Sequence, residues 1–186
     1  MVERAEEDRF NWRLPIYAAV SASLVFLSLV IWSYDFGDLF YLFVIVPIVS
    51  IVLIIFVFRG RGHRRLSALS MLIVFWVISW GMTRHTYDLR TIGRWALWSS
   101  GYKAQVLAQP ANDGLQHAEW DGWGFAGSDT VVYVVFDPTD SLAGAAKSRA
   151  SGKFKGIPCE VPRVRRLESQ WYSVVLYTDT GWKDCS

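Results

Sequence analysis

Three side chains with acid–base or metal-binding chemistry lie two residues apart in the second half of the chain. His117, Glu119 and Asp121 alternate along an expected β-strand, and alternate residues of a strand point to the same face. Such a trio could bind a divalent cation or supply the acid and base of an envelope hydrolase. The alternation also describes the solvent-facing side of an antiparallel strand whose inner side carries Ala118 and Trp120. We favour this second interpretation, and the sequence assigns no catalytic, metal-binding or cofactor-binding residue.

An aromatic, glycine-rich segment overlaps this strand, with the sequence WDGWGFAG at residues 120–127. Trp120, Trp123 and Phe125 could form an aromatic platform that recognises a ligand or another protein. Alternatively, the glycines form a bulge while the rings fill the core or touch the bilayer. The sequence leaves both interpretations open.

Charge and missing motifs narrow the classes of function. The net charge is +2 and neither half of the chain has a clustered excess of basic residues, so we expect no nucleic-acid partner. A short basic stretch is best explained as solvated, with lipid headgroups as its one conceivable partner; it comprises Lys147, Arg149, Lys153 and Lys155. The chain has no G-x-S-x-G elbow, Walker loop, Rossmann glycine pattern or H-E-x-x-H motif, so an enzymatic role is not favoured.

Three apolar segments dominate the first half of the chain, at residues 14–33, 39–58 and 66–83. A helix of about 20 residues, rising about 1.5 Å per residue, spans the hydrocarbon core of a bilayer. A helix also satisfies its own backbone hydrogen bonds, so these segments predict three transmembrane helices. Pro47 predicts a kink in the second helix. No charged side chain lies inside the segments, which favours an anchor over an ion or proton path.

The distribution of arginine predicts which side of the membrane each part faces. With three crossings, the tail at residues 1–13 shares a side with the 59–65 connection, and the C-terminal domain shares the other side with the 34–38 connection. The tail and the 59–65 connection together carry seven arginines, whereas the 34–38 connection carries only Asp35 and Asp38. Four basic residues after the third segment argue the other way. The larger group favours a cytoplasmic N-terminus and an exported C-terminal domain.

The chain has two cysteines, Cys159 and Cys185, both in the domain that this topology exports. An even number of cysteines in an oxidising compartment predicts a disulfide. Their wide spacing, without a nearby histidine or a further cysteine, argues against a zinc site. Two unrelated thiols are the alternative.

The elements that must position these residues follow from the pattern of the second half. Residues 84–100 are expected to form a juxtamembrane helix with Leu89, Ile92 and Ala96 on its apolar face and Arg90 and Arg94 opposite. Residues 101–186 form a soluble domain. Its predicted strands lie at residues 102–108, 115–123, 130–136, 161–167 and 171–178, with one helix at residues 141–149.

Asp137 and Asp140 precede that predicted helix. A turn and a helix cap explain them more simply than a metal site does. The predicted fold class is three membrane helices plus a small α+β domain with a mainly antiparallel sheet.

The stretches WDGWGFAG, FDPTDSL and GIPCEVP, followed by RRLES, resemble a group of uncharacterised bacterial membrane-anchored proteins with no known activity. The resemblance covers most of residues 100–178 and is weaker over the apolar segments. It implies a bacterial cell envelope, and together with the arginine distribution this predicts an inner-membrane protein with a periplasmic domain. We therefore expect a domain that binds a protein or an envelope component, in an interaction, sensing or immunity-like role. An envelope hydrolase using the acidic and histidine trio is the alternative, and membrane lipid is the expected surrounding partner.

Overall fold

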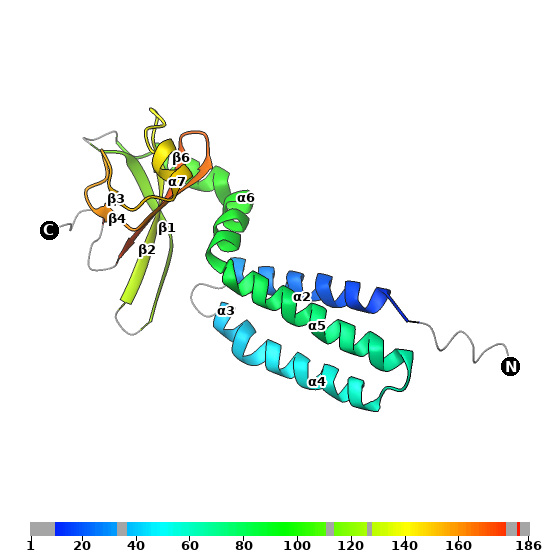
Figure 1. Cartoon of the computed structure of the whole chain (residues 1–186). Helices are drawn as coiled ribbons and strands as arrows, with labels where there is room; N and C mark the ends of the chain where they lie inside the picture. Colours follow the sequence, from blue (N-terminus) through cyan, green and yellow to red (C-terminus); the bar gives the residue numbers. More distant parts are fainter. Residues whose placement is uncertain (1–9, 33–36, 111–113, 126–127, 178–181, 183–186) are drawn as a thin grey trace. The chain divides into compact units, whose positions relative to one another are not determined.

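The computed structural model describes all residues except 1–9, 33–36, 111–113, 126–127, 178–181 and 183–186, and it leaves out the side chains of residues 123–129. The chain divides into two compact units, residues 1–90 and residues 91–186. The first unit is helical, and the second contains all the described strands (Figure 1).

Helices make up the first unit. They are α2 (Arg13–Trp32), α3 (Gly37–Phe40), the π-helical η1 (Tyr41–Ile45), α4 (Val46–Arg59) and α5 (His63–Arg84). Three of them in succession, α3, η1 and α4, form one continuous helix. Three stretches are long and apolar enough to cross a membrane, namely α2, the continuous helix Gly37–Arg59, and α5. The prediction of three membrane helices is confirmed, and these helices indicate a membrane location.

Pro47 affects the middle helix through its local hydrogen bonding. Proline has no N–H, and its ring would clash with the carbonyl of the residue four positions earlier, here Phe43. The turn before it is π-helical, and the N–H of Val46 donates to the carbonyl of Tyr41, five residues back. A π-helical turn is one way in which a helix absorbs such a disruption. The structure therefore has an irregular turn near the predicted kink.

The helices of the first unit pack around a shared core. Its buried residues come from α2, the middle helix and α5: Ala22, Phe26, Val30, Tyr41, Val46, Leu53 and Phe75. The hydroxyl of Tyr41 lies 2.8 Å from that of Ser79, and its ring packs edge-to-face on Phe26 with centroids 5.0 Å apart. A polar pair inside an apolar bundle has few alternative partners, so this contact helps to fix how the middle helix faces α5.

Helix α6 runs from Thr86 to Leu107, and its residues from Thr91 onward belong to the second unit. The predicted strand at residues 102–108 is therefore wrong. The apolar residues of that segment also fit helical spacing, because Tyr102 and Val106 lie seven and eleven residues after Trp95 and so share its face. Trp95 and Val106 are both buried.

Arg94 and Ile92 lie on opposite faces of this helix, as the sequence predicts, and the domain buries the face that carries Arg94. Arg94 is buried with Thr91 and Trp95, whereas Ile92 is 54% exposed. The reason is that Arg94 finds a buried charged partner in the sheet, which the sequence pattern of α6 alone does not reveal.

The second unit contains a four-stranded antiparallel sheet in the order β1-β2-β6-β5. Its strands are β1 (Gln116–Phe125), β2 (Ser128–Phe136), β5 (Arg163–Glu168) and β6 (Trp171–Tyr177). The two-stranded pair β3 (Gly152–Lys153) and β4 (Glu160–Val161) is separate, and α7 (Ala143–Ser148) follows β2. The predicted α+β domain with an antiparallel sheet is confirmed.

Both faces of the two central strands, β2 and β6, are buried. One face carries a core that includes Tyr133, Val135, Tyr172 and Val174, closed by α7 residues, Cys159 and Trp182. The other face carries Val132 and Val134, and α6 covers it through contacts of Trp95 with Trp120 and Trp171. Six consecutive residues of β6, Trp171–Leu176, are accordingly buried, which explains why all of them except Ser173 are apolar or aromatic.

Candidate functional site

The predicted acid–base trio lies on β1, and the structure divides it. The ring of His117 stacks on Trp182 with centroids 3.8 Å apart and contacts Tyr133 edge-to-face. Its Nδ1 lies 2.9 Å from the carbonyl of Leu115. Glu119 pairs with Tyr133 in the ladder and is exposed, so it shares the face of His117.

Asp121 lies on the opposite face because of a β-bulge. The register shifts between Glu119 and Asp121, so that Glu119 opposes Tyr133 while Asp121 opposes the adjacent Val132. One extra residue in a strand reverses the alternation beyond it. The prediction that all three side chains share a face is thus wrong for Asp121. Among the described residues no group of three or more His, Cys, Asp or Glu side chains could hold a metal ion.

Asp121 forms a buried ion pair with Arg94 of α6. The Arg94 Nη1 and Asp121 Oδ1 atoms are 2.8 Å apart, with the two side chains 6% and 4% exposed. The bulge also displaces the carbonyl of Trp120, which accepts hydrogen bonds from Arg94 Nη1 at 3.2 Å and from the Tyr102 hydroxyl at 3.4 Å. Asp121 therefore docks α6 onto the sheet.

The structure describes the side chain of Trp120 in the aromatic segment but not those of residues 123–127. Trp120 is 5% exposed and contacts Trp95 and Tyr102 edge-to-face, so it belongs to the core between α6 and the sheet. The backbone of Trp123 and Phe125 continues β1 opposite Thr130 and Ser128. The side chains of Trp123 and Phe125 lie outside the described part of the chain, so a recognition role for them stays a prediction.

Asp137 organises the turn that leads into α7. Its carboxylate accepts hydrogen bonds from the N–H and hydroxyl of Thr139, the hydroxyl of Ser141 and the N–H of Leu142, at 2.6–3.0 Å. Burial raises the pKa of Asp137, but these donors outweigh it and hold the pKa below its usual value. These contacts give Asp137 the turn role that the sequence suggests, whereas the N-cap of α7 is Leu142 and the helix has no side-chain hydrogen bond at its cap.

Asp140 ties this turn to the connection between β5 and β6. It accepts hydrogen bonds from the Tyr172 hydroxyl at 2.5 Å and the Gln170 N–H at 2.9 Å, and it pairs with Arg166 at 2.7 Å. The hydrogen bond from Tyr172 is the main cause of the lowered pKa of Asp140. Burial, together with this hydrogen bond, raises the pKa of the Tyr172 hydroxyl. The sequence pattern predicts a cap here, and the structure shows a link between two loops.

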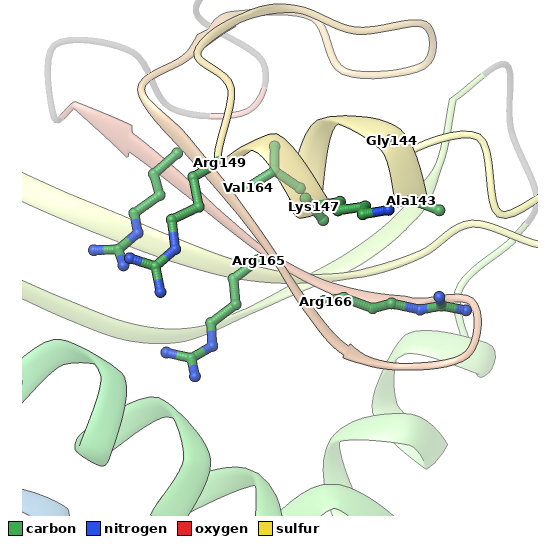
Figure 2. Close-up of a pocket in the computed structure, with 9 residues that line it drawn as sticks. Ala143, Gly144, Lys147, Arg149, Val164, Arg165 and Arg166 are labelled. Carbon is green, nitrogen blue, oxygen red and sulfur yellow. The ribbon is translucent and has the colours of Figure 1, made fainter.

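A basic pocket of about 530 Å³ lies between α7 and β5 (Figure 2). Its lining contains five cationic side chains and otherwise small or aliphatic ones: Ala143, Gly144, Ala146, Lys147, Arg149, Arg163, Val164, Arg165 and Arg166. On β5, Val164 points into the core, so Arg163 and Arg165 point to the other side of the strand. In Figure 2, Arg149 and Arg165 extend to one side, and Lys147 and Arg166 extend away from them.

The backbone of Arg149 adds a second feature to the basic pocket. Arg149 is the C-cap of α7 with φ 52°, in the left-handed conformation, and its N–H donates to the carbonyls of Ala145 and Ala146. Glycine is the usual residue at such a position because a Cβ is unfavourable there. The chain therefore keeps a long cationic side chain at a position where local backbone energetics favour glycine.

Sequence reasoning found only part of this pocket. It grouped Lys147 and Arg149 with Lys153 and Lys155, which do not line the pocket. The missing partners come from β5, where the strand period of Arg163-Val164-Arg165 was the available signal. The sequence analysis grouped residues that are close along the chain. The pocket instead combines residues of α7 with residues of β5, which packs beside α7.

Cys159 is buried in the core that also contains Trp182. Cys185, its predicted partner, lies outside the described residues, so the pairing stays a prediction. Comparisons of this chain with protein-family models, curated proteins and solved structures find no match.

Proposed function

We propose that this chain is a membrane-anchored binding protein whose periplasmic α+β domain binds an anionic component of the bacterial envelope. One observation carries the proposal, the gathering of five cationic side chains around the basic pocket. Arg166, one member of this group, forms an ion pair with Asp140. A ligand with several anionic oxygens would complement this group of cationic side chains.

Arginine is suited to such a ligand. Its planar guanidinium donates paired hydrogen bonds to phosphate or carboxylate oxygens and keeps its charge at every physiological pH. A volume of about 530 Å³ lies in the range of roughly 300–1,000 Å³ typical of small-molecule sites, so a phosphorylated headgroup or sugar would fit. Envelope components commonly carry such groups, and the resemblance to bacterial membrane-anchored proteins implies that compartment.

Binding is favoured over catalysis by the arrangement on β1. A hydrolase would need its acid and base to converge on one substrate. The bulge instead places Asp121 in an ion pair with Arg94, on the face opposite His117 and Glu119.

A disulfide between Cys159 and Cys185 is part of the proposal. Trp182 packs in the same core as Cys159, and Cys185 follows Trp182 by three residues, about 10 Å of extended chain. The bridge would fasten the end of the chain to the domain, as suits an oxidising compartment.

Titration with inorganic pyrophosphate tests the basic pocket. The full chain in neutral detergent should bind it, and Arg163→Gln with Arg165→Gln should weaken binding roughly 100-fold, from about 1.5 kcal/mol per charged hydrogen bond lost. Lys153→Gln with Lys155→Gln removes the same charge outside the pocket and should change the affinity less than about threefold. Equal losses in both variants would show that net charge, and not the pocket, attracts the anion.

Reporter fusions test the sidedness. Alkaline phosphatase is active after export, whereas green fluorescent protein fluoresces when it stays in the cytoplasm. A C-terminal fusion should therefore give phosphatase activity without fluorescence. The reverse pattern would place the domain in the cytoplasm and remove the basis for a periplasmic ligand and for the disulfide.

A further inference from the structure

A half-open cavity lies between the membrane helices, at the end of the first unit that carries the α4–α5 connection. Its volume is about 590 Å³, and its lining comes from the start of α2, the end of α4 and the start of α5 (Figure 1): Asn11, Leu14, Leu53, Phe56, Arg59, Gly60, Arg64, Ser67, Ala68 and Met71. The hydrogen bond from the Asn11 N–H to the Ser67 hydroxyl, at 3.2 Å, holds the start of α2 against α5.

The lining changes from charged to apolar along the helices. On α5, Arg64 and Met71 lie seven residues apart on one face, which is about 10 Å along the axis. On α4, Arg59 ends the helix, and Phe56 and Leu53 follow one and two turns deeper. The cavity therefore has a basic mouth at the level of the helix ends and an apolar interior within the span.

We propose that this cavity binds one anionic phospholipid, with its phosphate at Arg59 and Arg64 and an acyl chain along Leu53, Phe56 and Met71. Charge complementarity identifies the occupant, because basic pockets between membrane helices select acidic headgroups. Helix α5 begins at the mouth with Gly62 as its N-cap, and the positive end of its dipole adds to the attraction. The apolar interior matches a lipid tail and not a soluble phosphate. This proposal is independent of the function proposed for the domain.

Native mass spectrometry of the full chain in neutral detergent tests this site. Phosphatidylglycerol and phosphatidylethanolamine with identical acyl chains differ in headgroup charge, and we expect the former to bind at least about tenfold more tightly. Arg59→Gln with Arg64→Gln should weaken phosphatidylglycerol binding about 30-fold, from about 1 kcal/mol per charge. The control variant, Arg61→Gln with Arg65→Gln, removes two charges from the same connection at residues that do not line the cavity. It should change the affinity for phosphatidylglycerol by less than about threefold.

Equal losses in the two double variants would overturn the proposal, as would equal binding of the two lipids. If the Arg59 and Arg64 variant does not fold, Leu14→Trp is the second test, because it fills the mouth from a partly exposed position without changing charge. It should lower phosphatidylglycerol binding at least about tenfold. Unchanged binding by a folded Leu14→Trp protein would likewise show that lipid does not occupy this cavity.

Discussion

The buried pair between Arg94 and Asp121 predicts a large and non-additive effect on the stability of the domain. Both side chains are almost fully buried, and their atoms are 2.8 Å apart. Asp121→Ala leaves the Arg94 charge buried without its partner, which costs about 3–5 kcal/mol of unfolding free energy. Arg94→Met should cost a similar amount, because it strands the carboxylate and removes a donor to the Trp120 carbonyl.

The double variant distinguishes a buried pair from two independent side chains. Arg94→Met with Asp121→Ala leaves no lone buried charge, so its cost should be at least about 2 kcal/mol smaller than the sum of the single variants. The matched control is the partly exposed pair of Lys103 and Glu168. Removing either partner of that pair should cost less than about 1 kcal/mol, because solvent screens it.

Urea unfolding of the full chain in detergent measures these values when pulse proteolysis reports the fraction of folded domain. The reasoning would be refuted if either single variant cost less than about 1 kcal/mol. Strict additivity in the double variant would also refute it, since it would mean that the two charges do not interact.

Three further predictions concern the domain. The carboxylates of Asp137 and Asp140 have lowered pKa values in the folded domain. Their contribution to the unfolding free energy should therefore be complete above about pH 4 and be lost as the pH falls through their folded-state pKa values. In acid unfolding curves, Asp137→Asn should flatten this pH dependence. The raised pKa of Tyr172 has the opposite consequence, a loss of stability as the pH rises above the ordinary tyrosine value of 10.0, which Tyr172→Phe should remove. Arg149→Gly relieves the left-handed backbone conformation and removes a cation from the basic pocket. The unfolding free energy should stay level or rise by up to about 1 kcal/mol, while pyrophosphate binding weakens. A lower unfolding free energy would contradict this prediction.

The proposed disulfide makes one more prediction. Cys159→Ala and Cys185→Ala should each cost roughly 3–4 kcal/mol, the double variant should cost no more than either, and a reducing agent should abolish the difference from the native chain. Unequal single effects, or an effect of Cys159→Ala that persists under reduction at the same size, would mean that Cys159 acts only through packing.

The residue pattern predicted the secondary structure correctly in segments where a long apolar or β-branched run dominates. The three apolar segments predict their helices because lipid leaves the backbone no alternative, and the β-branched run from Thr130 to Phe136 lies within β2 as expected. The pattern failed at residues 102–108, where apolar spacing satisfied both a strand and the face of α6. It also failed at Asp121, because a bulge shifts register without any change in residue type.

The basic pocket illustrates a different limit. Arg149 and Arg165 lie on different elements and line one pocket because α7 packs beside the edge strand β5. Strand alternation could have placed Arg163 and Arg165 on one face, but nothing local indicates which helix lies next to them. The burial of Arg94 has the same origin, since its partner is on another element.

Protection of individual arginines by an anion tests the central claim most directly. The full chain in detergent would be treated with phenylglyoxal, with and without pyrophosphate, and the modification of each arginine quantified by peptide mass spectrometry. If the basic pocket is the anion site, pyrophosphate should slow the modification of Arg149, Arg163 and Arg165 several-fold while leaving Arg13 and Arg84 unchanged. Uniform protection of all arginines, or none at the pocket, would contradict the account.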